Sequence, residues 1–198
     1  MLLMSGALSC CVFIVVFLLD GWTRPGYSSA RHTISALALG RRGWIQTANF
    51  IVSGTGLIAG GLGVLQAQAS GFFAGMLMIL GNGLVASGAF AMDPMRGYPM
   101  GTSNGDPVEF SLSHRLHDHA GLVVFCCFPL TVFAAGFTMD SLGAHIVAGV
   151  VAALLVMGVA AFGSAWEQDS PVTGLIQKAV VIGALGWTSG TLLLLGPS

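Results

Sequence analysis

The side chains best suited to chemistry in this sequence stand just before a long apolar run. His114, His117, Asp118 and Gly121 are spaced by three, one and three residues, and on an α-helix this spacing puts them on one face. An imidazole titrates near neutral pH and a desolvated carboxyl group holds its proton more tightly, so such a face can donate and accept protons. We predict Asp118, His114 and His117 as catalytic residues, with Asp93 as a second acid.

Two polar segments of 27 residues, 20–46 and 93–119, collect most of the other polar side chains. We expect them to meet over a shared hollow, where arginines would hold an anionic or oxygenated head group. The predicted substrate-binding residues are Arg24, Arg31, His32, Tyr98 and Asn49. In the competing interpretation the ionisable groups pair with one another, for example Asp118 with Arg31 or Arg24, as charges near lipid usually do.

Other chemistries have weaker support in the residue pattern. A divalent metal would need His32 or Asp93 to complete the ligand set offered by His114, His117 and Asp118, so we expect no cofactor and keep a divalent metal as an alternative. Haem is disfavoured because no apolar run carries a central histidine. Ser35, Ser111 and Ser113 stand near histidines as candidate nucleophiles, without a glycine-elbow motif.

The composition sets the class of protein. The chain has 198 residues, of which 55% are hydrophobic and 8% charged, whereas soluble domains carry about 25% charged residues. We therefore predict an integral membrane protein, with residues 1–198 forming one domain. The net charge of −1 gives no reason to expect binding to nucleic acid.

Six apolar runs are long enough, or nearly so, to cross a bilayer as helices, which takes about 20 residues each. They cover residues 2–19, 48–65, 72–92, 120–137, 144–165 and 172–195. The predicted fold is an all-α integral membrane bundle of six transmembrane helices with two polar loops on one face. Gly56 and Gly60 would let helix backbones approach closely. Residues 28–40 predict a short amphipathic helix along the membrane surface, with Ile34, Leu37 and Ala38 on one face.

The connections between the runs are uneven in charge. Successive spans alternate in direction, so the first, third and fifth connections share one membrane face, which holds 14 of the 15 charged residues; Asp140 is the exception. The positive-inside rule then predicts that the charged loops are cytoplasmic, with the protein in the cell (inner) membrane. The sequence indicates no oligomeric state.

Several short motifs resemble a broad family of small multi-span membrane proteins catalogued as domain of unknown function 998. The likeness covers residues 20–125 in the same order and implies a six-helix fold with polar motifs on one face, without an established reaction. The motifs are Arg24-Pro-Gly-Tyr-Ser, Arg31-His-Thr-Ile-Ser, Gly43-Trp44 with Asn49-Phe50, Asp93-Pro-x-x-Gly-Tyr-Pro-x-Gly101 and His114-x-x-His117-Asp118-x-Ala-Gly121. At fold level alone, the chain is similar to small integral-membrane cyclases and isomerases of isoprenoids.

The leading functional hypothesis is a membrane-embedded enzyme that acts by Asp/His proton transfer on a hydrophobic or amphiphilic, isoprenoid- or lipid-like substrate. A cyclase or isomerase (lyase/isomerase chemistry) is expected first, and a hydrolase is a further option. Acids, histidines and arginines gathered above an apolar slot are the arrangement that perturbs pKa values. The alternatives are a small transporter, a lipid-binding membrane module, or a structural subunit of a membrane complex.

Overall fold

The computed structural model describes residues 1–196, and this part of the chain is helical throughout apart from its connections. It forms six α-helices and one short 3-10 helix. In chain order they are α1 (Leu2–Thr23), η1 (Ile34–Ala38), α2 (Gly43–Gln66), α3 (Gly71–Ala89), α4 (Leu112–Gly136), α5 (Leu142–Glu167) and α6 (Thr173–Leu194).

Five of these helices, α1 to α5, are long and apolar enough to cross a membrane. The protein is therefore an integral membrane protein of multi-pass, helical character. The prediction of an all-α fold is confirmed, whereas six clear spans are not found within residues 1–196. The sixth helix, α6, has 22 residues, but its apolar character is diluted by polar side chains. These are Thr173, Gln177, Lys178, Thr188, Ser189 and Thr191.

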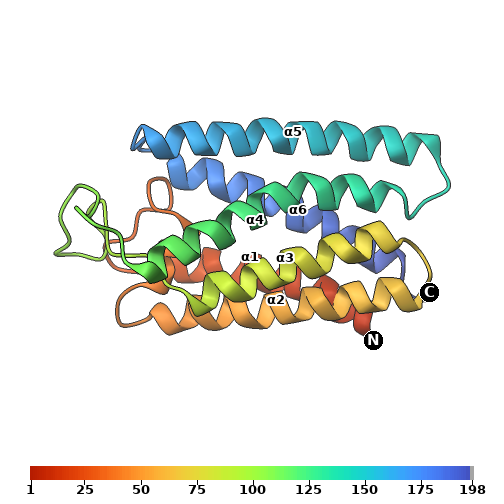
Figure 1. Ribbon diagram of the computed structural model, residues 1–198, viewed down its shortest axis with the longest axis horizontal. Helices are drawn as coiled ribbons and strands as arrows, with labels where there is room; N and C mark the ends of the chain where they lie inside the picture. Colours follow the sequence, from red (N-terminus) through yellow and green to blue (C-terminus); the bar gives the residue numbers. More distant parts are fainter. Residues whose placement is uncertain (197–198) are drawn as a thin grey trace.

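The helices run roughly parallel to the long axis of the molecule (Figure 1). α2 packs between α1 and α3, α4 packs against α3, and α6 contacts α1 and α4. α5 lies on the outside against α4 and α6 and buries few residues. The connections 24–42 and 90–111 lie at the same end of the bundle, away from the N-terminus (Figure 1).

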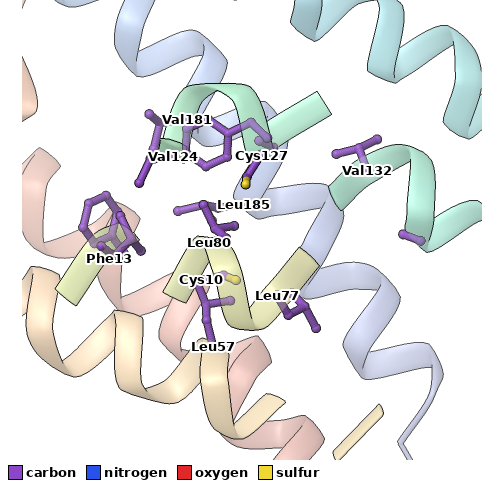
Figure 2. Close-up of a cluster of buried hydrophobic side chains, with 14 of the residues drawn as sticks. Cys10, Phe13, Leu57, Leu77, Leu80, Val124, Cys127, Val132, Val181 and Leu185 are labelled. Atoms are coloured by element: carbon purple, nitrogen blue, oxygen red, sulfur yellow. The ribbon is translucent and has the colours of Figure 1, made fainter. Parts of the chain in front are cut away.

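The core is built from side chains of α1, α2, α3, α4 and α6. Figure 2 shows Phe13, Leu57, Leu80, Val124 and Leu185 converging from these five helices, and all are buried. Lipid tails are as apolar as these side chains, so close packing rather than escape from water must hold the helices together within a bilayer.

Glycines make that packing close. A Cβ placed on Gly54 would meet the Gly81 carbonyl oxygen at 2.5 Å, and a Cβ on Gly81 would meet that of Gly54 at the same distance, so the backbones of α2 and α3 touch there. On the other side of α2, a Cβ on Gly60 would lie 2.9 Å from Gly6 Cα, and one on Gly56 would run into Ser9. The prediction that Gly56 and Gly60 serve helix packing is confirmed.

The predicted amphipathic surface helix is wrong in length and position. The helical part of residues 28–40 is limited to the five residues of η1, and Ile34, Ala36 and Leu37 are buried. η1 contacts α1, α2 and α6, so it closes the polar end of the bundle instead of lying along the membrane surface. This placement leaves Ser35 partly buried, beside His117.

We predict that Gly81→Ala destabilises the bundle while Gly75→Ala on the same helix does not. The new methyl group at position 81 has no room against α2, and overpacking of this kind costs about 1–3 kcal/mol. Nothing lies within 4 Å of a Cβ at position 75. Thermal unfolding of the purified variants in detergent micelles measures the difference. Equal midpoints for the two variants would contradict close packing of α2 on α3.

Candidate functional site

The two polar segments meet at one end of the bundle. Tyr98 of the second segment packs its ring against Tyr27 and His32 of the first, with centroid distances of 5.6 and 5.0 Å. A small apolar cluster also joins the two segments, formed by Ala36, Leu39, Met92, Met95 and Tyr98. The predicted convergence of the polar segments is therefore present in the structure.

A buried ion pair fixes the first segment to the end of α1. Asp20, only 4% exposed, pairs with Arg24 and accepts a 2.6 Å hydrogen bond from Arg42 Nη2. The Arg24 guanidinium also donates at 3.0 Å to the carbonyl oxygens of Leu37, Leu39 and Arg42. Arg24, predicted to bind substrate, is thus engaged inside the protein, where it closes the loop that carries η1.

The predicted pairing of Asp118 with Arg31 or Arg24 is wrong. Arg31 forms a 2.8 Å salt bridge with Asp169 in the connection between α5 and α6, and Arg24 pairs with Asp20. Asp118 instead lies 3.2 Å from Nε2 of His114, one helical turn away. Acids that lie closer to each arginine compete successfully for it, so the carboxylate of Asp118 is left to the histidine.

His114 is buried and connects the end of α3 to the start of α4. Its Nδ1 accepts a 2.8 Å hydrogen bond from the Asp93 backbone N–H, so the proton of a neutral ring is on Nε2, which faces Asp118. The Phe110 ring stacks on the imidazole at 4.3 Å. Asp118, whose side chain is 60% exposed, lies within ion-pair distance of Nε2 at 3.2 Å.

Asp93 lies behind this pair and organises the start of α4. Its two carboxylate oxygens accept hydrogen bonds of 2.7 Å from the Ser111 backbone N–H and hydroxyl, while Ser111 caps α4 through the His114 N–H. Burial raises the pKa of Asp93, but the hydrogen bonds from Ser111 outweigh it and hold this pKa below its usual value.

His117 carries its proton on the opposite nitrogen from His114. Nδ1 lies 2.7 Å from the Phe90 carbonyl oxygen and 3.1 Å from that of Ser87. Carbonyl oxygens only accept, so Nδ1 must be the donor. Nε2 of the neutral ring then carries a lone pair and accepts the 2.9 Å hydrogen bond from the Ser35 hydroxyl. The carbonyl groups left free at the end of α3 thereby set the tautomer of His117.

A hollow of about 390 Å³ opens beside these residues between α4, α5, α6 and η1, a volume in the range of small-molecule sites. Its polar end is lined by Thr33, Ser35, His117, Asp118, Glu167 and Gln177. Its walls are largely apolar and include Met92, Leu122, Phe125, Val159, Phe162 and Trp166. Gly121 lines it one turn below His117, as the predicted helix face requires. The arrangement suits a molecule with an apolar body and one reactive polar end.

A second hollow beside it, of about 20 Å³, is lined by Arg31, His32 and Tyr98 and has room for roughly one water molecule. Burial, together with the charges of Arg31 and Lys178, lowers the pKa of His32, so the ring is neutral at pH 7. Nδ1 of His32 accepts from the Ser28 N–H at 3.0 Å. These three predicted binding residues are therefore brought together in a space too small for a lipid-like substrate.

The remaining predicted binding residue is Asn49, which is buried within the bundle. Its side-chain amide donates to the Phe13 carbonyl at 3.1 Å and to Gln46 Oε1 at 3.3 Å, which ties α2 to α1. Among residues 1–196, no group of three or more His, Cys, Asp or Glu side chains is arranged to hold a metal ion.

Two residues that line the larger hollow were not predicted as site residues. Gln177 accepts a 2.7 Å hydrogen bond from the Ile34 N–H, and Ser35 is one of the three candidate nucleophiles but not one of the predicted catalytic or binding residues. No local spacing could have linked Ser35 to His117, because 82 residues separate them. The polar content of α6 is the signal that could have drawn attention to Gln177.

We predict that Asp20→Asn strongly destabilises the protein. It leaves the buried Arg24 guanidinium without its counter-charge, and breaking a buried pair costs about 3–5 kcal/mol. The measurement is the thermal unfolding midpoint in detergent micelles. Asp140→Asn, at an exposed aspartate between α4 and α5, serves as the control and should leave the midpoint unchanged. A small effect at position 20 would contradict the role assigned to this ion pair.

We predict that the effect of Asp93→Asn depends on pH. Because the pKa of Asp93 is lower in the folded protein, its carboxylate stabilises the fold at neutral pH, and this stabilisation disappears as the pH falls through that pKa. The variant should be less stable than the wild type by about 1 kcal/mol at neutral pH and equal to it in acid. Unfolding midpoints at several pH values test this, with Glu109→Gln as an exposed control. A difference that persists in acid would contradict it.

No curated protein and no solved structure matches this chain. A family model does match, and its match extends well beyond the motifs of residues 20–125. Described as "Protein of unknown function (DUF998)", it covers residues 7–194, and the chain therefore belongs to this family.

Proposed function

We propose that this protein is a membrane-embedded enzyme that acts by proton transfer on a hydrophobic or amphiphilic, isoprenoid- or lipid-like substrate, as a cyclase or isomerase does. The observation that carries the proposal is the hollow of about 390 Å³, in which Asp118 and His117 stand at the polar end of largely apolar walls. A substrate with an apolar tail and an oxygenated or unsaturated end matches such a surface.

The depth of the hollow supports an elongated substrate. Asp118 and Phe125 both line it and are seven residues apart on α4, which is about 10 Å along a helix. The tail would lie along Leu122, Phe125 and Phe162, with the reacting carbons below Asp118. Membrane lipids are then the natural surroundings of the substrate and the partners with which this surface is in contact.

The chemistry needs one group that donates a proton and one that accepts it. Asp118, whose exposed carboxyl group lies 3.2 Å from Nε2 of His114, is the proposed donor. His117, neutral with a lone pair on Nε2, is the proposed acceptor. In an isomerisation Asp118 would protonate one carbon and His117 would remove a proton from another. Asp93 acts on the pair from behind, through its backbone N–H to His114.

Arg31 is the proposed contact for a charged head group. Thr33, Met92 and Trp166 line both hollows, so a head group at the polar end of the larger one would lie close to the residues around Arg31. The salt bridge of Arg31 with Asp169 is partly exposed, and exposed pairs of this kind contribute little stability. Rearranging it to accept an anionic group would cost little.

We further propose that α6 is the sixth span. Its 22 residues measure about 33 Å at the helical rise, enough to cross the hydrocarbon core. Its polar residues Gln177, Lys178 and Thr188 are buried, so they face the bundle and not lipid. With six spans, the positive-inside rule favours charged loops in the cytoplasm, and we propose the cell (inner) membrane as the location.

A second candidate function is lipid binding without chemistry. A hollow of about 600 Å³ lies between α4, α5 and α6 near the other end of the bundle. It is lined mainly by small and apolar residues, among them Gly136, Val147, Trp187 and Leu194, and it contains no acidic residue or histidine. An acyl chain could occupy it without any group that would react with it.

Deuterium exchange tests the proposed enzyme. We expect wild-type protein, reconstituted with the total lipid extract of the expressing cells in deuterium oxide, to yield a lipid species with carbon-bound deuterium, detected by mass spectrometry. Asp118→Asn should lower the rate about 100-fold or more. His119→Gln is the matched control, since His119 is exposed and bonds the Arg115 carbonyl. Equal rates for Asp118→Asn and wild type, or bound lipid without deuterium, would overturn the proposal, and the second result would favour lipid binding.

A further inference from the structure

We propose that Ser35 is the nucleophile of an acyl-transfer reaction in the hollow of about 390 Å³, with His117 as its general base and a lipid ester or thioester as the substrate. The inference rests on the proposed function in one respect, that the hollow takes a lipid-like molecule. It goes further by naming the bond that reacts, a carboxylic ester or thioester, and the atom that attacks it.

The first support is the hydrogen bond between nucleophile and base. The Ser35 hydroxyl donates to Nε2 of His117 at 2.9 Å, a distance at which proton transfer accompanies attack. It makes no other hydrogen bond within residues 1–196, and both side chains line the hollow. Ser35 is only partly buried, so a carbonyl carbon entering the hollow can reach its oxygen.

The second support is the group behind the histidine. In serine hydrolases a carboxylate usually holds the far nitrogen of the imidazole, fixing its tautomer and stabilising the imidazolium. Here the carbonyl oxygens of Phe90 and Ser87 take that place. Ser87 is in the last turn of α3 and Phe90 is the residue that caps this helix, and carbonyl groups at the C-terminal end of a helix carry the partial negative charge of its dipole. The same two tasks are thus met without a third side chain.

The third support is a donor for the developing oxyanion. Gln177 is 4% exposed and lines the hollow. Its Oε1 is engaged by the N–H of Ile34, the residue before Ser35, which orients the amide. Nε2 makes no hydrogen bond among the described residues and is left for the hollow. An amide donor whose oxygen is held by the residue before the nucleophile suits an oxyanion site.

The proposed reaction has two balanced halves. Ser35 Oγ bonds to the carbonyl carbon of the ester while its proton passes to Nε2 of His117, and Gln177 donates to the oxyanion. The bond to the leaving alcohol or thiol then breaks, and His117 returns the proton to that leaving group. In the second half, water adds to the acyl-Ser35 ester, His117 takes its proton and passes it to Ser35 Oγ, and a carboxylic acid is released.

The test uses the full-length protein in detergent micelles with an alkyl fluorophosphonate probe and p-nitrophenyl decanoate. We expect mass spectrometry to locate the probe on Ser35. Ser35→Ala should lose the label and hydrolyse the ester at least 100-fold more slowly, with an unchanged unfolding midpoint. Ser113→Ala, whose hydroxyl bonds the Ala91 carbonyl, is the matched control and should behave as wild type. Because His117 is buried and its replacement risks misfolding, Gln177→Ala supplies a second variant, expected to slow hydrolysis at least tenfold.

The outcomes separate this inference from the proposed function. No label on wild-type protein, a label on another residue, or wild-type hydrolysis by Ser35→Ala would overturn the nucleophile. Deuterium incorporation by Asp118 in a protein without a reactive Ser35 would leave the proton-transfer proposal intact. Conversely, labelling of Ser35 in a protein that incorporates no deuterium would support acyl transfer and overturn the isomerase.

Discussion

Backbone groups at the ends of helices need partners in a setting with little water, and this requirement shapes the polar end of the molecule. The last carbonyl groups of a helix have no partner within it, and lipid supplies none. At the end of α3, His117 provides these partners by donating hydrogen bonds to the carbonyl oxygens of Ser87 and Phe90. Arg24 does so for the carbonyls around η1, and Lys178 for those of Ser29 and His32. Side chains that look catalytic in the sequence thus satisfy backbone groups.

The same bonds prepare the side chains for chemistry. A neutral histidine whose Nδ1 donates to carbonyl groups has its lone pair on Nε2. A neutral histidine whose Nδ1 accepts from a backbone N–H has its proton on Nε2. His117 and His114 are three residues apart on one helix, yet their surroundings give them opposite tautomers. Backbone geometry therefore divides the roles of base and donor between two residues that appear equivalent in the sequence.

The helices and the helix face of the site followed from local patterns. Apolar runs separated by polar segments predicted α1 to α5, and the spacing from His114 to Gly121 predicted a face on α4, because both depend on neighbours within a few turns. The long-range partners did not follow. Arg31 meets Asp169 across 138 residues, and no pattern near either residue specifies that contact. The Asp20–Arg24 pair differs from this, because the two residues are one helical turn apart at the end of α1, and their spacing could have predicted the contact.

The position of α5 bears on how a molecule would enter the hollow lined by Asp118 and His117. Val159, Phe162 and Trp166 of this helix form its outer wall, while few residues of α5 are buried, among them Ala148, Ala152 and Leu155. Elements that share little of the core separate from it at the lowest free-energy cost. The wall formed by α5 is consequently the one expected to yield first, so a sideways route from the bilayer would cost less free energy than a passage through the tightly packed glycine contacts of α2 and α3.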